Sequence, residues 1–388
     1  MAGTRRRLTP TAQAEFRPLL EKARAISGRV DELRRSFAGA HRLAHLAQTQ
    51  EALTRAELSL ALVESLAARA ELTGQLRVQA LANYGAKARP VRLRRHNRLS
   101  RLLDKALSRL GPFGAALIAW RSGLLWPQDR PLFDAEFYRA ANPDVTGARM
   151  VPLTHYLVTG GREGRAPHPL LDEVHYGAQN AEVLAATGLT CLEHYERAGA
   201  ALGCSPHPLF DVGHYLSQGV TLSRGEDPLS HYLRQGWRER LTPHVLFDPA
   251  WYGRQSAEPL EIAPLLHYLT VGWREGRSPH PLFDPQWYLN QDSGLAAAGV
   301  EPLTHFLTTG AREGRNPSPW FDLAHYVAAR GEGLAASANP LVDYLQGGAW
   351  AVGEAHPGLP TAGYLAARPG LARRGVTPLE HWARRRGQ

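Results

Sequence analysis

Histidine is the residue whose number and spacing in this chain most suggest chemistry. Of 17 histidines, 14 follow residue 130, and they recur at three positions of a repeated pattern. Imidazole binds metals and transfers protons, so such a ladder could indicate a metal site. However, equivalent residues of successive repeats lie one per unit and do not converge as three or four ligands. We therefore predict structural hydrogen bonds, with His155 bonded to a neighbouring loop carbonyl, and expect no metal and no other cofactor.

Catalytic signatures are missing from the sequence. It contains no Gly-x-Ser-x-Gly, no phosphate-binding glycine loop and no His-Glu-x-x-His. An active site needs unlike groups at one place, whereas the acidic residues here recur once per repeat as helix caps. The two cysteines, Cys191 and Cys204, form neither a disulfide framework nor a four-ligand zinc pattern. We expect no catalytic residues.

The elements that position these residues are seven repeats. A Phe/Leu-Asp-x3-Tyr unit recurs with its tyrosines 36 to 39 residues apart, from Tyr138 to Tyr364. Its Asp is typical of a helix N-cap, preceded by an aromatic or leucine that staples onto the Tyr. A second unit, Pro-Leu-x-His-Tyr-Leu, starts a second helix with Pro at its first position. The sequence therefore predicts an all-α solenoid of about seven two-helix repeats over residues 131–388.

A linker of the form Gly-x-Arg-Glu-Gly-Arg-x-Pro-His follows the second helix, with full Arg-Glu-Gly-Arg copies at residues 162–165, 274–277 and 312–315 and tryptophan before two of the Arg-Glu pairs. Its charges either pair within the turn or form a repeated rim that contacts a sugar or an anion. On the second hypothesis the candidate ligand or partner surface contains Trp237, Arg238, Trp251, Trp273, Arg274, Arg277, Trp287, Arg312 and Arg315.

Residues 1–85 have a different composition. No Gly or Pro occurs from Ala40 to Thr73, and apolar residues fall at alternating three- and four-residue steps from Leu53 to Ala70. This pattern predicts either a helical hairpin that turns near Gly39 or a coiled coil that makes a homo-oligomer through residues 40–80.

Residues 86–130 hold the basic excess of the 388-residue chain, whose net charge is +9. Residues 87–109 contain nine Lys or Arg and one acid, Asp104. Leucines from Leu99 to Leu110 form one face of a predicted helix. Either this face docks on the repeats or the helix contacts an anionic membrane; nucleic acid is disfavoured because no aromatics are interleaved. The candidate membrane contacts are Arg94, Arg95, Arg98, Arg101, Lys105 and Arg109.

Three stretches carry a resemblance to a known family: FDPAWY (247–252), FYRAANPDV (137–145) and APLLHYLTVGWREGRSPHPLFDPQWYLNQD (263–292). Over residues 98–388 the chain resembles the FDxxYYLxxNPDVxxAGxxPLxHYLxxGWxEGRxP repeats of bacterial surface-polysaccharide proteins. Those repeats often precede or link glycosyltransferase domains. The resemblance implies a role in envelope polysaccharide synthesis.

The functional expectation combines the repeats with this resemblance. We expect a non-enzymatic scaffold that binds a polysaccharide or a protein partner, such as a glycosyltransferase or an envelope-assembly component. The alternatives are a glycosyltransferase-related protein with a degenerate site and a peripheral membrane adaptor acting through residues 87–110. No signal peptide and no apolar run of membrane-spanning length is visible, so we expect a cytoplasmic location, with the surface of the inner membrane as the alternative.

Overall fold

The structure is a computed structural model that describes most of residues 70–86, 98–108 and 132–386, with scattered positions elsewhere. The chain divides into two units, Met1–Leu62 and Val63–Gln388. The described residues of the first unit are helical and exposed. The predicted turn near Gly39, and the predicted coiled-coil positions other than Ala70, lie outside the described residues.

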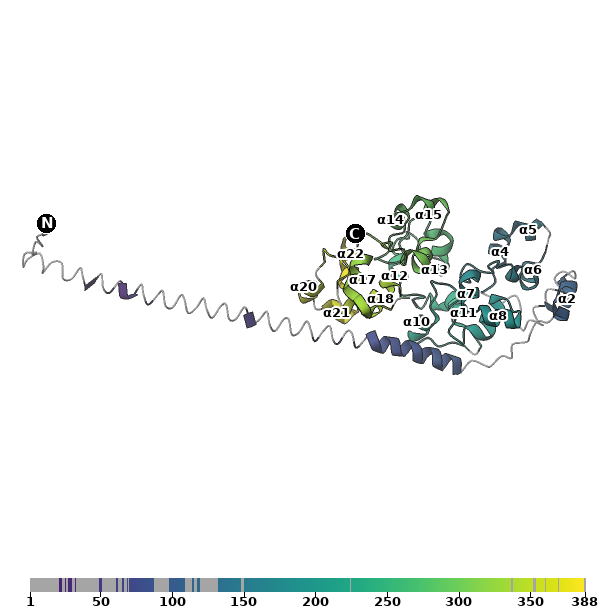
Figure 1. Ribbon diagram of the computed structural model, residues 1–388, viewed down its shortest axis with the longest axis horizontal. Coiled ribbons are helices and arrows are strands. Elements are labelled where there is room, and N and C mark those ends of the chain that lie inside the picture. The colour runs from purple at the N-terminus through teal and green to yellow at the C-terminus, as the bar shows by residue number, and fades with distance from the viewer. Residues whose placement is uncertain are drawn as a thin grey trace, which may run out of the picture. The chain divides into compact units, whose positions relative to one another are not determined.

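The prediction of an all-α repeat solenoid is confirmed for the second unit. The described part of residues 132–386 contains helices and no strand, apart from isolated bridges in the linkers. Figure 1 shows the repeat helices following one another from α4 to α22. The two helices of successive repeats are α4 (Ala135–Ala141) and α6 (Pro152–Val158), α7 (Glu173–Gln179) and α9 (Cys191–His194), α10 (Val212–Ser217) and α11 (Pro228–His231), α12 (Pro249–Gly253) and α13 (Pro264–His267), α14 (Pro285–Asn290) and α16 (Pro302–His305), α17 (Leu323–Arg330) and α18 (Pro340–Asp343), and α20 (Thr361–Ala366) and α22 (Pro378–Arg386).

The first helix of each repeat begins as its sequence predicts. The aspartates at the N-caps of α4, α7, α10, α12, α14 and α17 each accept backbone N–H bonds of the first turn. In the third repeat, Phe210 packs on Tyr215 with ring centroids 5.2 Å apart, as the hydrophobic staple requires. The backbone N–H of Asp211 donates to the carbonyl of Pro243 at 2.9 Å, so the start of the repeat is tied to the linker at its end.

A tyrosine–histidine hydrogen bond joins the two helices of a repeat. The hydroxyl of Tyr215 lies 2.7 Å from Nδ1 of His231. For His155 a loop carbonyl was predicted as the partner, but its Nδ1 bonds to the hydroxyl of Tyr138. The equivalent pairs lie 2.7 to 2.9 Å apart: Tyr138–His155, Tyr176–His194, Tyr252–His267, Tyr288–His305 and Tyr364–His381. In the sixth repeat Asp343 replaces the histidine and accepts from Tyr326 at 2.6 Å.

A glycine makes room for this bond. A Cβ added at Gly236 would overlap the hydroxyl oxygen of Tyr215, and Gly160, Gly199, Gly272 and Gly310 have the same relation to their tyrosines. Gly160 was predicted to end its helix, and α6 does end at Val158, before the 3-10 turn η3 (Gly160–Arg162). From the second repeat to the sixth, the second helix instead continues through the equivalent glycine as a π-helical turn: η4 (Tyr195–Gly199), η5 (Tyr232–Gly236), η6 (Tyr268–Gly272), η7 (Phe306–Gly310) and η9 (Tyr344–Gly348).

The second unit also includes helical residues 70–86, which the sequence analysis assigned to the N-terminal zone. Arg77 Nη2 donates to Asp211 Oδ2 at 2.7 Å, and the hydroxyl of Tyr84 donates to the carbonyl of Glu226 at 3.3 Å. The opposite side of this helix exposes Leu72 and Leu76. The homo-oligomer through residues 40–80 stays a prediction.

Candidate functional site

The buried histidines of the linkers are committed to backbone hydrogen bonds. His168, His207 and His244 each accept, at Nδ1, the N–H of the residue two positions later at 3.0 to 3.1 Å. Burial lowers the pKa of His168 and His207 to about 4 and that of His244 to about 3, so these rings are neutral at pH 7. Across the described residues, no three His, Cys, Asp or Glu side chains gather as ligands for a metal ion.

The second arginine of each full linker forms an intramolecular clamp. Arg165 Nε pairs with Glu163 at 2.8 Å, and its Nη1 donates to Asp144 at 2.8 Å. Arg315 repeats this geometry with Glu313 at 2.6 Å and Asp292 at 2.9 Å. These contacts match the first of the two hypotheses for the linker charges, pairing within the turn, rather than a rim that contacts an anion.

Arg277, the matching residue of the fourth repeat, pairs with Glu275 at 2.6 Å and donates to the hydroxyl of Ser256 at 2.7 Å. Arg312 lies exposed on the linker of the fifth repeat. Of these candidate surface arginines, Arg277 and Arg315 therefore hold their own loops.

Two of the four candidate tryptophans serve packing. Trp273 is buried and donates its Nε1 hydrogen to the carbonyl of Leu269 at 3.2 Å, while Arg274 stacks 4.4 Å from its ring centroid. Trp251 donates its Nε1 hydrogen to Ser278 Oγ at 3.1 Å. Trp287 in α14 is half-buried.

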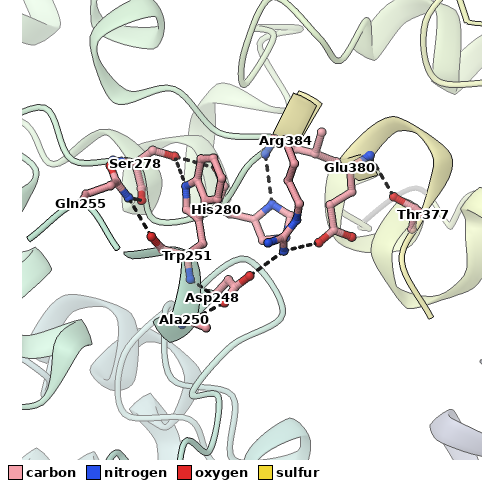
Figure 2. Close-up of polar contacts among 10 residues, drawn as sticks. Asp248, Ala250, Trp251, Gln255, Ser278, His280, Thr377, Glu380 and Arg384 are labelled. Carbon is pink, nitrogen blue, oxygen red and sulfur yellow. Dashed lines mark hydrogen bonds and ion pairs between the residues drawn. The ribbon is translucent and has the colours of Figure 1, made fainter. Parts of the chain in front are cut away.

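The last repeat contacts the ring of Trp251, and Figure 2 shows Arg384 of that repeat bonded to Asp248. The guanidinium of Arg384, from α22, lies 5.6 Å from the ring centroid, and that of Arg254 lies 5.4 Å from it. Arg384 Nη2 also donates to Asp248 Oδ2 and to Glu380 Oε1, each at 2.6 Å. Trp251 is therefore part of a contact between the fourth and seventh repeats, which the spacing of the repeats did not predict.

Trp237 and Arg238 line a cleft of about 250 Å³. The Arg238 guanidinium carbon lies 4.3 Å from the centroid of the Trp237 ring. The other lining residues come from the first linker, the second helix of the third repeat and the fourth repeat: His168, Leu233, Glu261, Ile262, Ala263 and Leu266. A concave site with an aromatic ring, apolar walls and a few polar groups is typical of a ligand site.

The protonation of His168 gives the cleft a defined polar group. Its Nδ1 accepts the N–H of Leu170 at 3.0 Å, so the neutral ring carries its proton on Nε2 and is a hydrogen-bond donor there. Glu261 is exposed and acidic, whereas Arg238 is exposed and basic. The cleft is therefore lined by one cation, one anion and one neutral imidazole around an aromatic and apolar centre.

Glu261 and Ile262 were missed from the sequence because they belong to the loop whose length varies. Residues 254–263, between α12 and α13, contain no helix, whereas α5 (Pro143–Gly147), α8 (Ala181–Thr187) and α15 (Ser293–Ala297) occupy the matching loops of other repeats. The spacing from Tyr252 to His267, 15 residues, is the shortest tyrosine–histidine spacing among the repeats. This short loop was the one signal that could have located the cleft.

The predicted basic helix is present as α2 (Arg98–Leu107). Lys105 is exposed, the side chains of Arg98 and Arg101 are not described, and Arg94, Arg95 and Arg109 lie outside the described residues. Leu102 is 66% exposed and Leu103 is 49% exposed. Leu102 and Leu103 therefore do not dock on the repeats, although α2 itself lies against α6.

Comparisons with protein-family models, with curated proteins and with solved structures found no match to this chain. No helix in the described part of the chain combines the length and the apolar character needed to cross a membrane.

Proposed function

We propose that this chain is a non-enzymatic binding module of bacterial envelope-polysaccharide assembly, and that it binds a saccharide in the cleft beside Trp237. The observation that carries the proposal is the composition of that cleft, in which the Trp237 ring, Arg238 and Glu261 share one hollow with apolar walls. A sugar ring has apolar C–H faces that pack on aromatic rings, and hydroxyl groups that bond to charged side chains. The resemblance of the repeats supplies the polysaccharide context.

The size of the cleft bears on the form of the ligand. A volume of about 250 Å³ lies just below the range of about 300 to 1,000 Å³ that is usual for small-molecule pockets. The cleft therefore suits one or two sugar units of a longer chain. The rest of the chain would lie over the exposed residues beside it.

The other candidate tryptophan sites are less suitable as platforms. Trp273 is buried, and Trp251 is contacted by two arginines and bonded to Ser278. Trp237 is half-buried and lines open space. We therefore assign the saccharide to Trp237.

The experiment is a screen of the full chain against immobilised bacterial polysaccharides, followed by titration of the best oligosaccharide. We expect binding that Trp237→Ala weakens by about tenfold or more, because aromatic contact area is lost. Nucleotide sugars are tested in parallel, since their hydrolysis would indicate the alternative of a glycosyltransferase-related site. Saccharide binding that Trp237→Ala leaves unchanged would overturn the proposal.

A further inference from the structure

The helix α2 exposes apolar residues and buries an acidic one. Leu102, Leu103 and Ala106 are exposed, while Asp104 is only 8% exposed. Leu107 and Ser108, on the same side as Asp104, are half-buried. Among the described side chains of α2, Asp104 is therefore the most buried, while two leucines are exposed.

The exposure of Leu102 and Leu103 differs from what is expected of a helix docked on a protein core. Such a helix buries its apolar stripe and leaves its charged residues in water. Two exposed leucines, adjacent in sequence and on one helix, form a patch that water solvates unfavourably. Ile118, in the segment that follows, is 1% exposed, so the protein does bury apolar side chains nearby.

The charge around this patch has one sign. Residues 87–109 carry nine Lys or Arg, and Asp104 is their single acid. Because Asp104 is turned inward and Lys105 is exposed, the outer surface of α2 combines leucine with positive charge. An apolar face flanked by cations is complementary to an anionic phospholipid surface.

We propose that α2 lies in the headgroup region of an anionic phospholipid bilayer. Leu102 and Leu103 enter the boundary with the acyl chains, and Lys105 lies at the level of the phosphates. This contact is independent of the saccharide cleft, and it would place the cleft at the membrane surface.

The test is co-sedimentation of the full chain with vesicles of phosphatidylcholine alone and of phosphatidylcholine mixed equally with phosphatidylglycerol. We expect the affinity of the chain for the mixed vesicles to be at least tenfold higher than its affinity for the neutral ones, and we expect salt to release the bound protein. The double variant Leu102→Ser/Leu103→Ser should weaken this binding by about tenfold or more. Both side chains are exposed, so the repeats should keep their circular dichroism spectrum.

Leu202→Ser is the matched control, because Leu202 is 73% exposed but lies in the second repeat. It should bind the mixed vesicles like the unaltered chain. Equal binding to neutral and anionic vesicles, or a double variant that binds like the control, would overturn the proposal. Failure to bind vesicles together with tight binding to duplex DNA would also overturn it, in favour of a nucleic-acid partner.

Discussion

The hydroxyl of Tyr215 and Nδ1 of His231 lie 2.7 Å apart in the interior of the third repeat, in the space left by the missing side chain of Gly236. Tyr215, His231 and Gly236 thus form one joint between two short helices, although 16 residues separate the tyrosine from the histidine and 5 separate the histidine from the glycine. Helices of four to seven residues have little stability alone. The joint explains why Tyr, His and Gly recur together.

Gly236→Ala should destabilise the protein by about 2 to 3 kcal/mol, because its Cβ would overlap the Tyr215 hydroxyl and force the joint apart. Gly253→Ala is the matched control. A Cβ at Gly253, in α12, meets nothing within 4 Å, so this change should be neutral or slightly stabilising. Urea denaturation of both variants measures the difference, and equal free energies of unfolding would contradict the role of the joint.

Tyr215→Phe should cost about 1 to 2 kcal/mol, because it leaves the buried Nδ1 of His231 without its partner. The double variant Tyr215→Phe/Gly236→Ala should lose less free energy of unfolding than the sum of the two single losses, because the hydroxyl that the new Cβ would meet is gone. A double-mutant cycle by urea denaturation measures this coupling. Simple additivity would show that the glycine and the hydroxyl do not share one space.

Arg384→Ala should destabilise the contact between the fourth and seventh repeats. Arg384 bonds to Asp248 at 2.6 Å, and the side chains are 27% and 23% exposed. Asp248→Asn keeps the helix cap and removes the charge. A thermal-denaturation cycle of the two substitutions should give a coupling of about 1 kcal/mol. The exposed Arg385→Ala is the control, and an equal loss there would argue against a specific contact.

Acid should destabilise the repeats before it affects exposed carboxylates. The pKa of His168 and His207 is lowered to about 4 and that of His244 to about 3 by burial, so the folded state stays unprotonated while the unfolded state takes up protons below about pH 6.5. Stability is therefore full above pH 6.5 and is lost as the pH falls toward 4. Each of the three histidines should contribute about 1 to 2 kcal/mol of loss between pH 7 and pH 5.

Urea denaturation at pH 7 and pH 5 measures this loss. His244→Asn should reduce the difference between the two pH values. His356→Asn is the control, because His356 accepts the same type of bond, from the Gly358 N–H at 3.0 Å, but is only half-buried. If both variants changed the pH dependence equally, burial of the linker histidines would not be its cause.

The repeat was predictable because its rules are local. An Asp cap, a Phe–Tyr staple and a Pro at the first helical position act within a few residues, so their order along the chain predicts the helices directly. The tyrosine–histidine bond was missed because it spans 15 to 18 residues and a variable loop. Leu102 and Leu103 are exposed although they belong to the apolar stripe of the helix. The pattern within a helix does not decide burial alone, because the elements packed around the helix also determine it.

The cleft was only half predictable. Trp237 and Arg238 belong to the regular linker pattern, whereas Glu261 and Ile262 come from an irregular loop that no periodicity describes. Trp251 occupies a regular repeat position, but its surroundings could not be predicted from the repeat. Its place in the repeat resembles that of Trp287, but Arg384, 133 residues away along the chain, packs against its ring.

The saccharide cleft is tested most directly by titrating one oligosaccharide into Arg238→Ala and Arg274→Ala. Both arginines stack on the preceding tryptophan, at 4.3 and 4.4 Å, and both follow a π turn, but only Arg238 lines the cleft. We predict that Arg238→Ala weakens binding by about tenfold, while Arg274→Ala binds like the unaltered chain. Equal affinities for the two variants would contradict the assignment of the cleft as the binding site.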